Sequence, residues 1–311
     1  MSTSPRARSR ILASAHRNFK AAGMGAGIIQ REVKRLKWTI PSQRPHEGAD
    51  LLGRIDAYLT AAGVDAAHLT LRDLYAIDQV HAFGYSATMA HLAGIELTAD
   101  MHVVDVGSGL GGAARVLAAE SGCRVTGVDV NAAMVEAASV LTHRVHLEHR
   151  VAFVAANAME LPISDGTVDH VWCHYVTMNI EDKKQFAREA ARVLKPGGHL
   201  SVVEVVAGPN APPTYPLPWA LRESESFLAG PRVLRDAIVA AGLVIVVEQG
   251  DLPRPPWPPG PRVVQRLDVV IGDWETREHN MITARRQRQV TDQFLLACKP
   301  DRSRQRRPAR L

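Results

Sequence analysis

The sequence predicts an α/β domain built on a mostly parallel sheet, and three observations support this prediction. Short runs rich in β-branched residues recur along the chain, amphipathic helical stretches separate them, and no internal repeat is present. Strands that alternate with helices form a parallel sheet with helices on both faces. The chain has 311 residues, 46% of them hydrophobic, which is enough to bury a substantial core.

Seven segments are predicted as strands, each a short apolar run bounded by turn residues. They are 102–106, 124–130, 151–155, 168–176, 199–206, 243–249 and 289–299. The first six alternate with helices and should therefore run parallel to one another. The seventh follows about forty residues without this pattern, and a strand inserted there beside the sixth has to run antiparallel.

Helical periodicity is found between these strands and also ahead of the first one. The predicted helices are 51–63, 71–94, 111–120, 131–149, 181–195 and 231–242. The helix at 181–195 ends in Lys-Pro-Gly-Gly, a common stop signal. The two helices before the first strand would cap the carboxyl edge of the sheet. Proline-rich stretches at 207–219 and 251–262 interrupt the pattern and are predicted as irregular segments.

The positive charge is concentrated at the two ends of the chain. Residues 1–20 carry five Lys or Arg and no acid, and residues 299–311 carry six with one acid. Because the whole chain is +5 and these ends are +10, the remainder is −5. We therefore predict a basic, disordered extension at 1–50, a folded domain at 51–298 and a basic tail at 299–311. A mildly acidic body makes nucleic acid an unlikely partner.

Other features of composition narrow the class of protein further. No segment reaches the roughly 18 apolar residues of a membrane span. The three cysteines, Cys123, Cys173 and Cys298, are far apart and lack the spacing of a zinc site, so we expect reduced thiols and no metal. The N-terminal stretch lacks a secretory-type apolar run, and we expect a cytoplasmic location.

The stretch VVDVGSGLGG, Val103 to Gly112, forms the turn after the first predicted strand and satisfies two nucleotide-binding patterns. Gly107, Gly109 and Gly112 match the dinucleotide fingerprint, which would hold NAD. Gly107, Gly109 and Gly111 with Asp105 match the pattern of a turn that holds S-adenosylmethionine (SAM). In both cases glycine allows the backbone to approach the ligand, with a helix N-terminus behind it.

Two acidic residues bear on the choice of nucleotide. Asp129 ends the second predicted strand, where a carboxylate can hold ribose hydroxyls, and it fits either nucleotide. Asp105, at the mouth of the glycine turn, would repel a pyrophosphate but attract the cationic SAM. Charges about 4 Å apart interact by about 1 to 4 kcal/mol at surface-like dielectrics. Asp105 therefore favours SAM.

Residues 100–206 resemble the class I SAM-dependent methyltransferases. The motifs that carry the resemblance are VVDVGSGLGG, VTGVDV, NAMELPISDGTVDHVWCHYVTMNIEDK and ARVLKPGGHLSVVEV. The upstream DLYAIDQVHAFGYSAT is similar to the small-molecule branch, which includes sarcosine, dimethylglycine, quinol and tocopherol methyltransferases. The resemblance implies a Rossmann-like seven-stranded sheet, mostly parallel with an antiparallel last strand, helices on both faces, an N-terminal helical cap and a lid insertion.

The resemblance also implies a set of cofactor-binding residues. The glycine turn would approach the methionine part of SAM, Asp129 would hold the ribose, and Val130 would pack on the adenine. Asn157 stands where the family often has aspartate, and it keeps a carbonyl acceptor for the adenine amino group. The full set is Asp105, Gly107, Ser108, Gly109, Gly111, Asp129, Val130, Asn157, Ala158 and His174.

Methyl transfer from SAM depends more on aligning the acceptor with the methyl group than on covalent catalysis, because the methyl group of SAM is already activated. Orientation alone contributes about 7 to 11 kcal/mol. A general base matters only where the acceptor arrives protonated, and His81, His174 and Tyr175 are the candidates. We expect the acceptor pocket to come from the N-terminal helices and from lid segments 207–230 and 250–288.

The function predicted from the sequence is methyl transfer from SAM to an N or O atom, or less favourably a C atom, of a small-molecule metabolite. Two alternatives remain open at this point, an NAD-dependent oxidoreductase and a noncatalytic SAM-binding protein. The sequence does not specify the acceptor or the oligomeric state.

Overall fold

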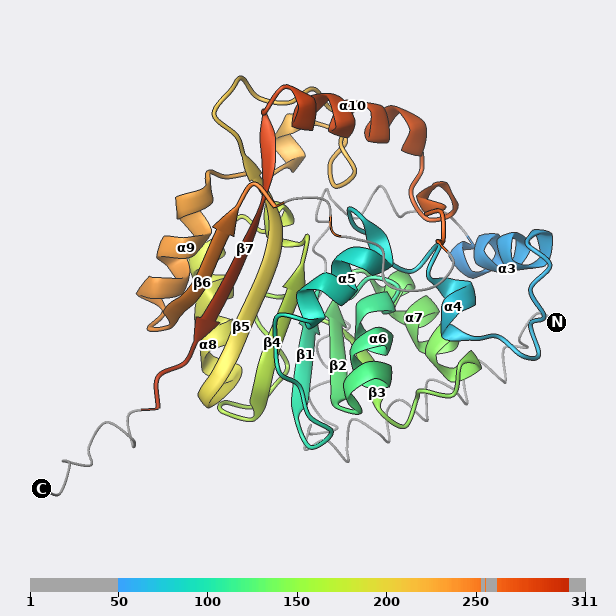
Figure 1. The fold of residues 1–311 in the computed structure, drawn as a ribbon, viewed down its shortest axis with the longest axis horizontal. Helices are drawn as coiled ribbons and strands as arrows, with labels where there is room; N and C mark the ends of the chain where they lie inside the picture. Colours follow the sequence, from blue (N-terminus) through green and yellow to red (C-terminus); the bar gives the residue numbers. More distant parts are fainter. Residues whose placement is uncertain (1–49, 253–254, 256–261, 302–311) are drawn as a thin grey trace, which may run out of the picture.

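The computed structural model describes residues 50–252, 255 and 262–301, and a seven-stranded sheet runs through them (Figure 1). The order of the strands across the sheet is β3-β2-β1-β4-β5-β7-β6. Their bounds are β1 His102–Val106, β2 Arg124–Asp129, β3 Val151–Ala155, β4 Val168–His174, β5 Leu194–Ala207, β6 Val244–Gly250 and β7 Val290–Cys298. The two predicted basic ends lie outside the described residues, apart from Asp50 and residues 299–301.

The last strand, β7, lies between β5 and β6 and runs antiparallel to both. The neighbouring pairs among β1 to β5 are parallel. The predicted Rossmann-like sheet with an antiparallel last strand is thus confirmed. β5 begins five residues earlier than its predicted start at 199, because the Lys-Pro-Gly-Gly stretch joins the ladder: Gly197 N–H donates to the carbonyl of Lys299 at 2.7 Å.

Helices cover both faces of the sheet. The helices after β1 and β2 pack on one face, and those after β4 and β5 pack on the other. Their bounds are α6 Gly112–Ser121, α7 Ala132–Arg144, α8 Lys183–Val193 and α9 Pro231–Ala240. The predicted helix at 131–149 was too long, because the chain turns at His146, which has φ 59°, and Leu147 N–H donates back to the Thr142 carbonyl.

Ahead of the sheet lie α3 Leu51–Ala61, α4 Leu71–Leu74 and α5 Gly84–Leu92. The prediction of one helix over 71–94 was wrong, since residues 75–83 are irregular. Asp78 in this segment is buried and pairs with Arg115 of α6 at 2.7 Å. A Cβ at Gly112 would lie 2.4 Å from the Asp78 carbonyl oxygen, so only glycine allows this close approach. The segment therefore packs directly on the start of α6.

The remaining helix, α10 Trp274–Arg286, crosses above the carboxyl ends of the strands, on the edge where β4 and β5 end (Figure 1). Three short 3-10 turns complete the described structure: η2 Thr177–Asn179, η3 Glu223–Glu225 and η4 Leu267–Val269. Within the part of the chain that the structure describes, no helix has the length and apolar character needed to cross a membrane.

Candidate active site

A cavity of about 490 Å³ opens at the carboxyl ends of the central strands, beneath α10. It lies where the strand order reverses between β1 and β4, which is the usual position of a ligand in such sheets. Its volume is within the range of small-molecule sites. One end is formed by the glycine turn and the ends of β2 and β3, and the other by residues far apart in the sequence.

The glycine turn is held against β2 by backbone hydrogen bonds. The N–H groups of Gly107 and Ser108 both donate to the Val128 carbonyl, at 2.7 and 3.1 Å. Gly107 has φ 74°, and a Cβ there would lie 2.2 Å from a methyl carbon of Val176. This position therefore requires glycine both for its dihedral angle and for its packing. Gly107 and Gly109 line the cavity.

Asp129 lies at the cavity wall, at the end of β2, as the sequence predicted. Its Oδ2 accepts the Gly109 N–H and its Oδ1 accepts the Asn131 N–H, both at 2.8 Å. Burial raises its pKa, and these backbone bonds oppose that shift. The carboxylate is held in place by the turn, and each oxygen retains lone pairs that can accept ligand hydroxyls.

Asp105, Ser108 and Gly111 are not among the residues that line the cavity, although Ser108 and Gly111 belong to the turn itself. Asp105 is only 2% exposed and its Oδ2 has no hydrogen-bond partner. Burial, followed by the charge of Asp129, raises the pKa of Asp105 to about 7. The expectation that Asp105 stands at the mouth of the turn is therefore corrected. It lies beneath the turn, where it acts on a ligand only through its charge.

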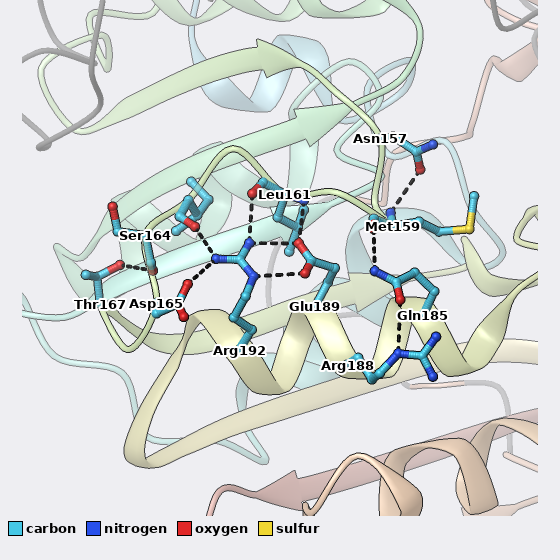
Figure 2. A network of polar contacts seen from close by, with 11 residues as sticks. Asn157, Met159, Leu161, Ser164, Asp165, Thr167, Gln185, Arg188, Glu189 and Arg192 are labelled. Carbon is cyan, nitrogen blue, oxygen red and sulfur yellow. Dashed lines mark hydrogen bonds and ion pairs between the residues drawn. The ribbon is translucent and has the colours of Figure 1, made fainter. Parts of the chain in front are cut away.

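Val130, Asn157 and Ala158 line the same end of the cavity. Asn157 Oδ1 accepts the Met159 N–H at 2.9 Å, which leaves one lone pair for a ligand. Figure 2 shows how α8 holds the loop that follows β3. Arg192 donates to the carbonyls of Leu161 and Ile163 at 2.9 and 2.7 Å, and Gln185 donates to the carbonyl of Met159 at 2.9 Å.

The three candidate catalytic residues come together at the far side of the turn. The rings of His81 and His174 are 4.5 Å apart, and the ring of His81 stacks on Tyr175 at 5.6 Å. His81 and Tyr175 line the cavity, whereas His174 is buried behind them with neither ring nitrogen hydrogen-bonded. Sequence reasoning missed His91, whose ring lies 4.9 Å from His174 and stacks on Trp172.

Burial determines the charge state of these groups. Desolvation lowers the pKa of His81 to about 4 and holds that of His174 well below its ordinary value, with neighbouring imidazoles adding to the shift at His174. Both rings are therefore neutral near pH 7, and the two ring nitrogens of His81 lie 3.1 Å from the Ala82 carbonyl oxygen and 3.2 Å from the Thr88 hydroxyl oxygen. Burial raises the pKa of Tyr175 well above its ordinary value, so its hydroxyl keeps its proton and acts as a hydrogen-bond donor.

The second end of the cavity is mostly apolar and is built from both predicted lid segments, together with residues 81–83. Pro218 and Trp219 come from the first segment and α10 comes from the second. The α10 residues on the wall are spaced four, three, one and three apart, so they share one helix face: Trp274, Glu278, Met281, Ile282 and Arg285. Sequence reasoning did not single out Arg285 or its partner on β7, Asp292, because no local motif marks them.

The residues at the glycine end fit SAM. The cavity offers a backbone turn without side chains, a fixed carboxylate at Asp129 for ribose hydroxyls, and apolar side chains beside Asn157 for an adenine. A buried acid beneath the turn adds negative charge where SAM carries positive charge. No phosphate-binding cation faces this end among the described residues that line it.

Comparison with known proteins agrees with this geometry. Residues 104–202 match the family described as "Methyltransferase domain". The methyltransferase GfsG of Streptomyces halstedii is 29% identical over 72% of this chain and 82% of that protein. Residues 104–202 therefore form a methyltransferase domain, and the chain resembles the class I SAM-dependent methyltransferases in sequence and fold.

Two further similarities define how far this relationship extends. The 2-methyl-6-phytyl-1,4-hydroquinone methyltransferase of Synechocystis sp. is 38% identical, but over only 41% of this chain and 38% of that enzyme. This methyltransferase chain thus spans less than half of that relative. A solved geranyl diphosphate C-methyltransferase from Streptomyces coelicolor A3(2) shares the fold, with a TM-score of 0.58 at 20% identity over 84% of this chain and 96% of that one.

Proposed function

We propose that this methyltransferase transfers the SAM methyl group to an oxygen or nitrogen atom of an uncharged small molecule with a sizeable apolar body. One observation carries the proposal: the cavity that begins at the glycine turn continues into a wall of apolar and aromatic side chains. The side chains that form this wall include Phe83, Met178, Trp219, Leu267, Ile271, Trp274, Met281 and Ile282. The neutral ring of His81 lines the cavity, and the ring of His174 lies behind it.

The charges on the acceptor wall support an uncharged acceptor. Arg285 is the one Lys or Arg on the wall among the described residues, and Asp292 neutralises it by two hydrogen bonds at 2.8 and 3.2 Å. A diphosphate acceptor, such as the geranyl diphosphate of the structural neighbour, would find no free countercharge there. The exposed carboxylate of Glu278 also disfavours an anion.

The residues of the chain would act mainly by alignment. Bound SAM supplies a methyl group on a cationic sulfur, ready for in-line displacement. The glycine turn and Asp129 hold the nucleoside, and the apolar wall excludes water and orients the acceptor. For a hydroxyl acceptor, the carbon–oxygen bond forms as the carbon–sulfur bond breaks, and the hydroxyl proton passes to a neutral imidazole, His81 being the one that lines the cavity.

Glu278 beside Trp274 favours a second candidate acceptor, an organic ammonium held by charge and by cation–π contact. An amine of this kind must lose a proton before it can be methylated, which the neutral histidines would also assist. The comparisons give no support to the NAD-dependent oxidoreductase considered from the sequence. A cytoplasmic location remains our prediction from the sequence.

Calorimetric titration with SAM and with NAD⁺ tests cofactor choice, and we expect heat from SAM alone. Transfer of a labelled methyl group to equal concentrations of 2-naphthol, 2-naphthylmethylamine and geranyl diphosphate tests the acceptor class. We expect labelled product from 2-naphthol. Label in the diphosphate alone would contradict the proposal, and SAM binding with no transfer to any of a broad set of uncharged acceptors would favour the noncatalytic alternative.

A further inference from the structure

Asp292 on β7 is a shared partner of two side chains at the acceptor end of the cavity. Its carboxylate is 6% exposed and receives hydrogen bonds from Arg285 Nε and a terminal nitrogen, at 3.2 and 2.8 Å. Burial, followed by the charge of Asp292, raises the pKa of Tyr175 well above its ordinary value. Both Arg285 and Tyr175 line the cavity. One buried acid therefore fixes one residue of the cavity wall and acts on a second through its charge.

Arg285 and Tyr175 also contact residues 81–83, which precede the sheet in the sequence. The Arg285 guanidinium lies over the Phe83 ring, 5.1 Å from its centroid, and Tyr175 stacks on His81 with ring planes 11° apart. Phe83 and Tyr175 both have positive φ, 62° and 57°, which is unusual for bulky residues. Such backbone strain is maintained only where the surroundings hold it, most often at binding sites. The arrangement joins β4, β7, α10 and residues 81–83.

The charges of Arg285 and Asp292 together affect which acceptors the cavity can bind. Arg285 without Asp292 would present a cation to the acceptor, and Asp292 without Arg285 would present a buried anion. Together they cancel each other's charge while still offering polar edges, which leaves Glu278 as the charged side chain on this wall without an ion-pair partner among the described residues. An isolated charge in such a site interacts strongly with a ligand charge, because little water screens it.

We propose that Asp292 is a specificity-determining residue, which positions Arg285 and cancels its charge so that uncharged acceptors are preferred to acids. This inference rests on the proposed function, since it concerns the acceptor end of the same cavity. It assigns to β7 a role in acceptor choice that no sequence motif indicates.

The test uses three probes of one size and different charge: 2-naphthol, 2-naphthoate and 2-naphthylmethylammonium. Their dissociation constants are measured by calorimetry on the full chain saturated with S-adenosylhomocysteine, so that no turnover occurs. The wild type should bind 2-naphthol most tightly. Asp292→Asn should improve naphthoate affinity relative to naphthol by about tenfold, because it exposes the charge of Arg285.

Arg285→Gln should have the opposite effect and shift preference toward the ammonium probe by a similar factor. The double variant Asp292→Asn with Arg285→Gln should return to a preference for 2-naphthol. Glu275→Gln is the matched control, because Glu275 is exposed on α10 and does not line the cavity. It should leave all three probe ratios unchanged.

Unchanged ratios in both single variants would overturn the inference, as would shifts of the same sign in the two. If Asp292→Asn does not fold, Arg285→Gln alone tests the inference. The proposal is then contradicted if this variant shows no increased preference for the ammonium probe. Failure of the proposed function is distinguishable: it would show in the wild type as absence of SAM binding or of methyl transfer to 2-naphthol, whereas failure of this inference leaves both intact.

Discussion

The two ends of the cavity are constructed in different ways. The cofactor end consists of backbone turns and a carboxylate that directly follow β1, β2 and β3, so the elements that form it are close in sequence and neighbours in the sheet. The acceptor end is formed by side chains from residues 81–83, Tyr175, Trp219 and α10, and Asp292 of β7 supports Arg285 of α10. The cofactor end is thus specified locally, and the acceptor end exists only when distant parts of the chain meet.

This difference in construction suits the two ends of the cavity to two kinds of ligand. A turn that faces the ligand with backbone and no side chains tolerates changes in nearby side chains, and it suits a ligand common to many enzymes. A wall of side chains changes with each substitution, and it suits an acceptor that differs from one enzyme to another. The following predictions test this contrast, from the largest expected effect to the smallest.

Removing the internal support of the cofactor end should cost the most. Arg115 is fully buried and donates to Asp78, to Thr142 and to the Leu110 carbonyl. Arg115→Ala leaves the Asp78 carboxylate buried without its cation, and we expect a loss of about 3 to 5 kcal/mol in the free energy of unfolding. Denaturant unfolding measures it. Arg235→Ala, at an exposed ion pair, is the control and should cause no measurable loss.

Weakening the carboxylate of the cofactor end should lower SAM affinity. In Asp129→Asn, the side chain can accept only one of the two N–H groups of Gly109 and Asn131 and loses its charge. We expect the SAM dissociation constant to rise by about 30- to 100-fold. Calorimetric titration checks this, with the exposed Asp236→Asn as control. A change below threefold would contradict the role given to Asp129.

Truncating the acceptor wall should separate the two ends functionally. Trp274→Ala removes apolar surface from the α10 face of the cavity. We expect the KM for an apolar acceptor to rise by about tenfold, while the SAM dissociation constant stays the same. Steady-state kinetics combined with calorimetry makes the comparison. Equal loss of affinity for both ligands would mean that the two ends are not independent.

The smallest effect concerns pH. Asp105 has its pKa raised to about 7, so its carboxylate is charged only above that value, and SAM affinity should increase by about three- to tenfold from pH 6 to pH 8. Asp105→Asn should abolish this dependence. Calorimetric titration of SAM across this pH range, with both proteins, measures it.

The contribution of Asp105 to folding stability changes with pH in the opposite direction to its contribution to SAM affinity. The folded state holds the proton between the unfolded value of 3.8 and about 7. The contribution of Asp105 to stability is therefore fully present below pH 3.8 and is lost as pH rises through 7, relative to Asp105→Asn. Denaturant unfolding of both proteins measures this difference. A parallel pH profile of unfolding in the two proteins would contradict the burial of this carboxyl group.

The sequence predicted the sheet well because buried strands and capped helices leave local patterns. The positions of Gly107, Gly109 and Asp129 followed from the same motif, since strand, turn and helix fix them together. Residues 75–83 were misassigned, because apolar spacing cannot distinguish a helix from an irregular segment whose polar Asp78 pairs with a residue far along the chain. Asp105 was placed correctly in sequence but too near the ligand, since its orientation depends on the whole sheet.

The residues missed altogether have a common reason. His91 gains its significance from His174, which is distant in sequence. Arg285 and Asp292 are only seven residues apart, but they lie on a helix and a strand. Their place at the cavity depends on Phe83 and Tyr175, which are far away in the chain. No spacing rule joins a residue of α5 to one of β4, or α10 to β7 across a tyrosine. Only the assembled fold brings them into contact.

The position of β7 has a consequence for how the protein is made. This strand is synthesised after the other six strands of the described sheet, yet it pairs between β5 and β6 and carries Asp292, the partner of Arg285 on the cavity wall. A chain emerging from the ribosome can assemble β1 to β4 and its nucleoside turn while β6 still lacks a neighbour. Acceptor selection therefore arises only once β7 has been made, after the nucleoside-binding turn is already in place.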